Sequence, residues 1–118
     1  MASFEPGDVI KVPFPYTDRP TRQSRPALVV SMPALEDRHG LLWVVMITSA
    51  ESRGWPGDVI VRDLNLAGLP VASLVRTAKI ATLEARDAQR LGRLSSAQMV
   101  AVRRHLGGTL GIAGARAS

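Results

Sequence analysis

The sequence predicts a mainly β, α+β fold: a strongly curved sheet or small barrel with one C-terminal helix. Three observations support this prediction. The 118 residues suit one domain, here residues 1–118. Most of the chain consists of short apolar runs bounded by proline- and glycine-rich turns. Only the last quarter has apolar residues at helical spacing, and no internal repeat stands out.

The first two strands are predicted on either side of a polar loop. Residues 8–14 alternate between apolar and polar side chains, as in a half-buried strand, and Pro13 indicates an edge or a strand end. Residues 15–24 are polar and read as a loop. Residues 25–32 contain the run ALVV, which is typical of a short buried strand.

The central strand is predicted at residues 41–49, the most apolar stretch and rich in β-branched residues. A polar connection with about one helical turn, residues 33–40, precedes it. Residues 51–57 form a loop, and residues 58–62 a further short strand.

Two more segments complete the predicted sheet. Residues 64–70 contain the turn GLP. Residues 73–77 and 79–83 then read as two closely linked strands or as one bent strand.

A helix is predicted after Ser95, which lies three residues before Gln98 at capping-box spacing. Apolar residues follow at helical intervals: Met99, Val102 and Leu106. The pair Gly107-Gly108 is expected to end or weaken this helix.

Composition narrows the class of protein. The chain has no cysteine, which excludes disulfides and thiolate metal sites. Residues 1–12 lack the basic start and apolar run of a signal peptide, and the longest apolar run, residues 41–47, is too short to span a bilayer. We therefore expect a soluble, cytoplasmic protein.

Net charge points only weakly to a nucleic-acid partner. The formal charge is +5, and all but two of the 15 basic residues are arginine, whose planar fork suits phosphate. However, the first 85 residues are formally neutral, so the excess lies in the C-terminal part. A basic, solvated C-terminal region explains the charge equally well.

Five segments, in order along nearly the whole chain, resemble the MazF/PemK family of RNA-cutting toxins. They are GDVIKVPFPYTD at 7–18, RPALVVS at 25–31, ITS at 47–49, SLVRTAKI at 73–80 and RLGRL at 90–94. No single segment is specific, and the resemblance is carried by the ordered set.

The resemblance implies an SH3-like small β-barrel with a C-terminal helix. It also implies a homodimeric toxin of a type II toxin–antitoxin pair that cleaves single-stranded RNA sequence-specifically, without a metal or other cofactor. The 2′-hydroxyl would attack the neighbouring phosphate, giving 2′,3′-cyclic phosphate and 5′-hydroxyl ends. The partner would be an acidic, partly disordered antitoxin.

The expected catalytic residues are Arg25, Thr48 and Arg76. Arg25 lies where a polar loop enters a buried strand and would stabilise charge on the phosphate. Thr48 ends the central strand and would orient the 2′-hydroxyl or a phosphate oxygen. Arg76 matches an arginine that supports catalysis in part of the family. That family often has an acid two residues later, where this chain has Ala78, so the general base stays unassigned.

Expected RNA contacts come from two loops. In the first, arginines would contact the RNA backbone and a tyrosine would stack on a base: Tyr16, Thr17, Arg19 and Arg22. The second group follows the central strand: Ser49, Arg53 and Trp55. Each of these residues also has a structural interpretation, as a surface ion pair, a strand-capping residue, a solvated loop or, for Trp55, loop packing. No metal site is expected.

Two other functions stay open on the sequence alone. One is a non-catalytic binding module on the same barrel, such as a toxin that poisons a topoisomerase. The other is an inactive homologue, which Ala78 would favour.

Overall fold

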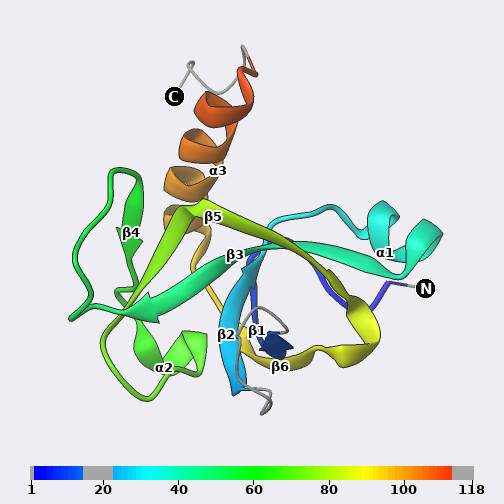
Figure 1. Cartoon of the computed structure of the whole chain (residues 1–118), viewed down its shortest axis with the longest axis horizontal. Coiled ribbons are helices and arrows are strands. Elements are labelled where there is room, and N and C mark those ends of the chain that lie inside the picture. The colour runs from blue at the N-terminus through cyan, green and yellow to red at the C-terminus, as the bar shows by residue number, and fades with distance from the viewer. Residues whose placement is uncertain (1, 15–22, 113–118) are drawn as a thin grey trace.

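The computed structural model describes residues 2–14 and 23–112, and its centre is one six-stranded antiparallel sheet. The strand order is β4-β5-β3-β2-β1-β6 (Figure 1). The strands are β1 (Asp8–Phe14), β2 (Gln23–Val29), β3 (Leu41–Ser49), β4 (Asp58–Ile60), β5 (Ser73–Glu84) and β6 (Gln89–Arg93).

Three α-helices and one 3₁₀ turn connect or follow the strands. They are α1 (Pro33–His39), α2 (Leu64–Ala67), η1 (Ala85–Asp87) and α3 (Ser96–Leu110). Helix α3 stands beside the bend of β5 and projects away from the sheet (Figure 1). No helix in the described ranges is long and apolar enough to cross a membrane.

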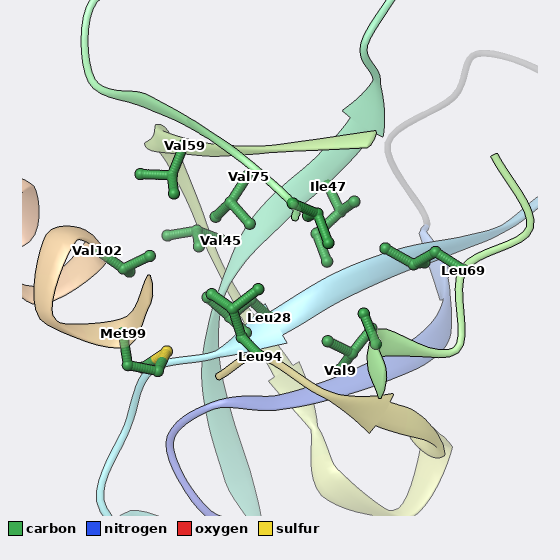
Figure 2. Packing of buried hydrophobic residues seen from close by; sticks show 12 residues of the cluster. Val9, Leu28, Val45, Ile47, Val59, Leu69, Val75, Leu94, Met99 and Val102 are labelled. Atoms are coloured by element: carbon green, nitrogen blue, oxygen red, sulfur yellow. The ribbon is translucent and has the colours of Figure 1, made fainter. Parts of the chain in front are cut away.

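Each face of the sheet has its own aliphatic core. One core includes Val9, Leu28 and Val45 and is closed by Met99 and Val102 of α3 (Figure 2). The opposite face has a second core: Phe4, Ile10, Val12, Ala27, Val29, Leu42, Val44, Leu83 and Ala85. Successive residues of a strand point to opposite faces, so the continuous apolar runs of β2 and β3 serve both cores.

The segment predicted as two strands or one bent strand is the single bent strand β5. Val45 pairs with Ile80, but the next residue of β3, Met46, pairs with Arg76. The extra residues of β5 form a bulge that bends the strand sharply. One long strand therefore pairs with β3 on both sides of the bulge, at residues 73–76 and 80–84, and residues 74–76 also pair with β4.

Helix α3 begins as predicted and ends later than predicted. Ser95 caps it, accepting a hydrogen bond from the backbone N–H of Gln98 at 3.3 Å. Of the two alternatives predicted for Gly107-Gly108, that the pair ends the helix was wrong, because the chain continues helically to Leu110 and stops at the left-handed residue Gly111. A glycine inside a helix costs only about 1 kcal/mol.

The α+β prediction, with a curved sheet and a C-terminal helix, is confirmed. Within the described residues the sheet is barrel-like but open, with β4 and β6 at its two edges. Strand β6 was not predicted. It is a short, mostly polar segment that becomes a strand by pairing with β1.

Candidate functional site

The predicted catalytic residues lie on three neighbouring strands, β2, β3 and β5. Met46 of β3 pairs with Ala27 on one side and with Arg76 on the other. Thr48 lies two residues farther along β3, and continuing the β2–β3 register by two residues brings Arg25 opposite Thr48. Because paired residues point to the same face of a sheet, Arg25, Thr48 and Arg76 project from one face.

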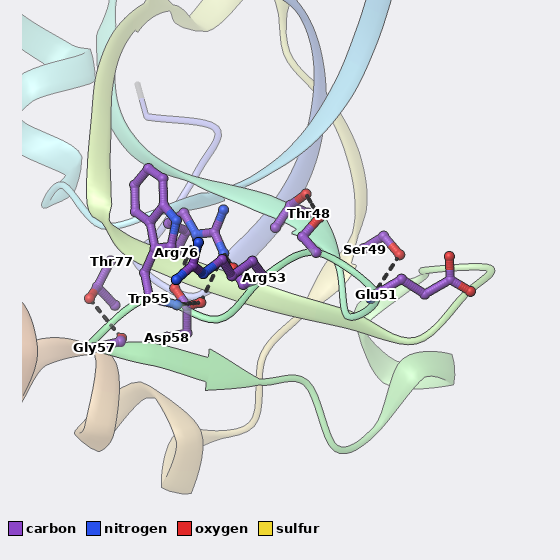
Figure 3. Close-up of polar contacts among 10 residues, drawn as sticks. Thr48, Ser49, Glu51, Arg53, Trp55, Gly57, Asp58, Arg76 and Thr77 are labelled. Atoms are coloured by element: carbon purple, nitrogen blue, oxygen red, sulfur yellow. Dashed lines mark hydrogen bonds and ion pairs between the residues drawn. The ribbon is translucent and has the colours of Figure 1, made fainter.

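Thr48 and Ser49 end β3 with their hydroxyls engaged in the loop that follows. The Thr48 side chain is half-buried, and its Oγ1 lies 3.2 Å from Oγ of Ser52. Oγ of Ser49 accepts a hydrogen bond from the backbone N–H of Glu51 at 3.2 Å. These contacts fix the two hydroxyls at the end of the strand (Figure 3).

Among the predicted site residues that the structure describes, Arg76 is the most enclosed, with only 10% of its side chain exposed. Its Nε and Nη2 donate to the two carboxylate oxygens of Asp58 at 3.2 and 3.0 Å. Nη2 also donates to the carbonyl oxygen of Arg53 at 2.7 Å. The guanidinium carbon lies 4.1 Å from the centre of the Trp55 ring (Figure 3). Arg76 is therefore not the plain strand-surface charge that the sequence left open.

Asp58 is the site residue that the sequence analysis missed. Besides the Arg76 contacts, its Oδ2 accepts the backbone N–H of Trp55 at 2.8 Å. Burial alone would raise the pKa of this carboxyl, but hydrogen bonds from Arg76 and Trp55, with the positive charge of Arg76, bring the pKa below its usual value. Asp58 therefore stays ionised at any ordinary pH.

A sequence signal for Asp58 exists, and it is an internal repeat. Residues 6–10 and 56–60 are both Pro-Gly-Asp-Val-Ile. In each copy the glycine has positive φ, at 101° for Gly7 and 89° for Gly57. Each aspartate then starts a strand, β1 or β4, and binds an arginine of the neighbouring strand. The expectation of no repeat was wrong: the repeat is only five residues long, and its two copies lie fifty positions apart.

The remaining predicted site residues are Arg25 and the RNA contacts expected from the two loops. Arg53 and Trp55 lie in the exposed loop before β4 and are joined to the site through Arg76. Arg25 is exposed on β2. The other four residues lie outside the described part of the chain: Tyr16, Thr17, Arg19 and Arg22.

Among the described residues, no group of three histidine, cysteine, aspartate or glutamate side chains is arranged to hold a metal ion. The site's charged groups are instead arginines with one carboxylate. Such groups can bind and stabilise a phosphodiester anion.

A separate apolar groove of about 570 Å³ lies between α3, the start of α1 and the bend of β5. Most of its lining is apolar, and several members are large exposed side chains: Met32, Trp43, Ile80, Leu110 and Ile112. None of the predicted site residues within residues 2–14 and 23–112 lines this groove.

The family of PemK-like, MazF-like toxins of type II toxin–antitoxin systems matches residues 5–110. No curated protein sequence matches the chain.

Three solved structures illustrate the likeness. A MazE–MazF complex from Deinococcus radiodurans has a TM-score of 0.77 at 27% identity, covering 93% of this chain and 98% of the other. MazF from the same organism has a TM-score of 0.75 at 26% identity, covering 92% and 97%. An endoribonuclease bound to its cognate antitoxin, from a mycobacterial species, shares the fold at 22% identity, with a TM-score of 0.74 and coverage of 93% and 97%.

The family match spans most of the chain, and the strands that carry Arg25, Thr48 and Arg76 lie within it. This chain therefore belongs to the PemK-like, MazF-like toxins of type II toxin–antitoxin systems.

Proposed function

We propose that the protein is a metal-independent, sequence-specific endoribonuclease that cleaves single-stranded RNA. The observation that carries the proposal is the register that directs Arg25, Thr48 and Arg76 to one face of the sheet. Membership of the toxin family and the endoribonuclease among the similar structures support it.

The proposed reaction uses the 2′-hydroxyl of the substrate as nucleophile. Arg25, exposed near the start of β2, binds the scissile phosphate and stabilises the charge that develops on it. The hydroxyl of Thr48 orients the 2′-hydroxyl or a phosphate oxygen. The products are a 2′,3′-cyclic phosphate and a free 5′-hydroxyl.

Arg76 has a supporting role in this proposal, because most of its donors are already used within the protein. Ala78 does not leave Arg76 without an acid, since Asp58 supplies one from β4. Asp58 is a poor general base, because its pKa is lowered and its oxygens already accept three hydrogen bonds.

The test is incubation of the purified protein with long single-stranded RNA in chelator, followed by mapping of the cut ends. Arg25→Ala is expected to lower kcat/KM at least 100-fold, because one aimed charge-stabilising donor contributes about that much. Arg86→Ala is the matched control, since Arg86 is also exposed and its partner is Glu84. Unchanged cleavage by folded Arg25→Ala protein would refute the assignment.

We further propose an acidic, partly disordered antitoxin as partner and a second copy of this chain over the apolar groove. The MazE–MazF complexes among similar structures support the first. The groove supports the second, because an apolar surface of this kind suits a like surface better than RNA or an acidic peptide. With this substrate and this partner, we also propose that the protein acts in the cytoplasm.

Light scattering after size-exclusion chromatography tests the second copy. Leu110→Glu puts a charge into the groove and is expected to convert a dimer to a monomer. Ile60→Glu, at an equally exposed apolar residue on β4, is expected to leave the dimer intact. A monomeric wild-type protein would contradict the proposed dimer.

A further inference from the structure

Trp55 is a large apolar side chain that folding leaves exposed. Its exposed fraction is 44%, although one face of the ring lies on the guanidinium of Arg76. The residue at the same place in the other copy of the repeat is Glu5, and the aromatic there is Phe4, which is only 9% exposed. The second copy of the repeat is therefore preceded by an exposed aromatic side chain, and the first copy by a buried one.

The exposed indole is nevertheless held in one position. The backbone N–H of Trp55 donates to Asp58 Oδ2 at 2.8 Å, and its carbonyl accepts the N–H of Asp58 at 3.1 Å. The guanidinium of Arg76 packs against the Trp55 ring and also donates a hydrogen bond to the Arg53 carbonyl of the same loop (Figure 3). A ring fixed before binding loses little conformational entropy when a ligand stacks on it.

Arg76 connects the indole to the face of the sheet that carries the proposed phosphate-binding residues. Arg76 projects from the same face as Thr48. It lies on the neighbouring strand, two residues from Leu74, the residue that pairs with Thr48. Standard strand spacings put the Cα atoms of Arg76 and Thr48 about 8 Å apart. A base on Trp55 would thus belong to a nucleotide close to the one held by Arg25 and Thr48.

We propose that Trp55 is a stacking platform for one unpaired nucleobase of the substrate, and that Asp58 is the positioning residue that holds this platform through Arg76. The inference rests on the proposed function, because it names a base subsite beside the scissile phosphate. Base stacking on an aromatic ring suits single-stranded nucleic acid, whose bases are free to turn outward.

Binding is measured with short 2′-deoxy homo-oligonucleotides of dA, dC and dU, which lack the attacking hydroxyl and stay intact. The background variant is Trp43→Phe, which leaves Trp55 as the one tryptophan of the chain. Base-containing oligonucleotides are expected to quench Trp55 fluorescence, and an abasic oligonucleotide of equal length is not.

Variants at Trp55 test the stacking ring, and variants at Asp58 test the residue that positions it. The affinities of the variants are measured by fluorescence anisotropy of end-labelled oligonucleotides, because substitution of Trp55 removes the fluorescent indole. Trp55→Ala is expected to weaken binding about tenfold, and Trp55→Tyr to restore most of it. Asp58→Asn is expected to lower affinity and to broaden base preference. Asp8→Asn is the matched control, because it alters the equivalent turn of the other repeat copy and a similar ion pair at the other edge of the sheet. All variants are compared well below their unfolding temperatures, and Arg76→Gln replaces Asp58→Asn if the latter does not fold.

The outcomes are decisive. Equal binding by Trp55→Ala and wild type, or equal quenching by the abasic oligonucleotide, would overturn the platform. Equal effects of Asp58→Asn and Asp8→Asn would overturn the positioning role. If wild type and Trp55→Ala cleave the same RNA site at equal rates, the inference fails while the proposed function stands. If base-containing oligonucleotides quench Trp55 fluorescence but the wild-type protein cleaves no RNA, the proposed function is refuted and the base-stacking role of Trp55 is not.

Discussion

The two copies of Pro-Gly-Asp-Val-Ile give the same turn but different surroundings. In each copy the aspartate N–H donates to the carbonyl three residues earlier at 3.1 Å, and the carboxylate accepts the N–H of that residue at 2.8 Å. In each, an arginine of the next strand bonds the carboxylate and the carbonyl five residues before the aspartate.

The surroundings differ in burial and in the number of contacts. Arg76 uses two nitrogens on Asp58, and both side chains are about nine-tenths buried. Arg90 uses one nitrogen on Asp8, and 54% of its side chain is exposed. The same five residues therefore support an enclosed ion pair at one sheet edge and a half-solvated pair at the other.

The largest difference is expected on removing each aspartate. Asp58→Ala removes the carboxylate that pairs with the buried guanidinium of Arg76, and it should lower the free energy of unfolding by about 3 kcal/mol. Asp8→Ala leaves Arg90 able to turn to water and should cost about 1 kcal/mol. Urea unfolding at one protein concentration measures both. Equal losses would show that burial is not what separates the copies.

A smaller difference is expected at the two turn glycines. Both have positive φ, so alanine is strained at either position, by about 1–3 kcal/mol. An added Cβ at Gly57 would lie 2.9 Å from Oγ1 of Thr77, which donates to the Gly57 carbonyl. At Gly7 it would lie 3.4 Å from Cγ of the flexible Met99. Thermal unfolding should rank Gly57→Ala below Gly7→Ala, and the reverse order would contradict this geometry.

Arg90→Ala is expected to cost about 1 kcal/mol, because Arg90 is half-exposed and screened by salt, and the enclosed Asp8 carboxylate still accepts the backbone N–H of Glu5. The cost should shrink further between 0.1 and 1 M sodium chloride. The loss on Arg76→Ala should hardly change over that range, since water and ions are excluded from the pair. Equal salt sensitivity, measured by urea unfolding, would remove the contrast.

The smallest expected effect is on pH dependence, because burial of Asp58 opposes the contacts that lower its pKa. A lowered pKa stabilises the fold above the unfolded value, near 3.8, and this stabilisation is lost as pH falls through the folded value. The stability of wild type relative to Asp58→Asn should thus be constant from pH 5 to 8 and decline below pH 4. An increase in acid would contradict the ion pair.

Much of the site was predictable because its residues mark strand ends. Thr48 lies near the end of β3, whose predicted bounds are the observed ones, Leu41–Ser49. The loop after it, with Arg53 and Trp55, was also placed correctly. The partner of Arg76 was not predictable in this way, because Asp58 lies 18 residues away on a strand of only three residues.

The sequence by itself determined the local elements: alternation and β-branched runs set the strands, and proline followed by glycine set the two turns. Local preferences act over a few residues. Only the tertiary structure decided that β6 pairs with β1, that Arg76 meets Asp58 and that Trp55 stays exposed. Those outcomes depend on which distant strands bury their apolar faces together, and identical pentapeptides thereby acquired different electrostatic environments.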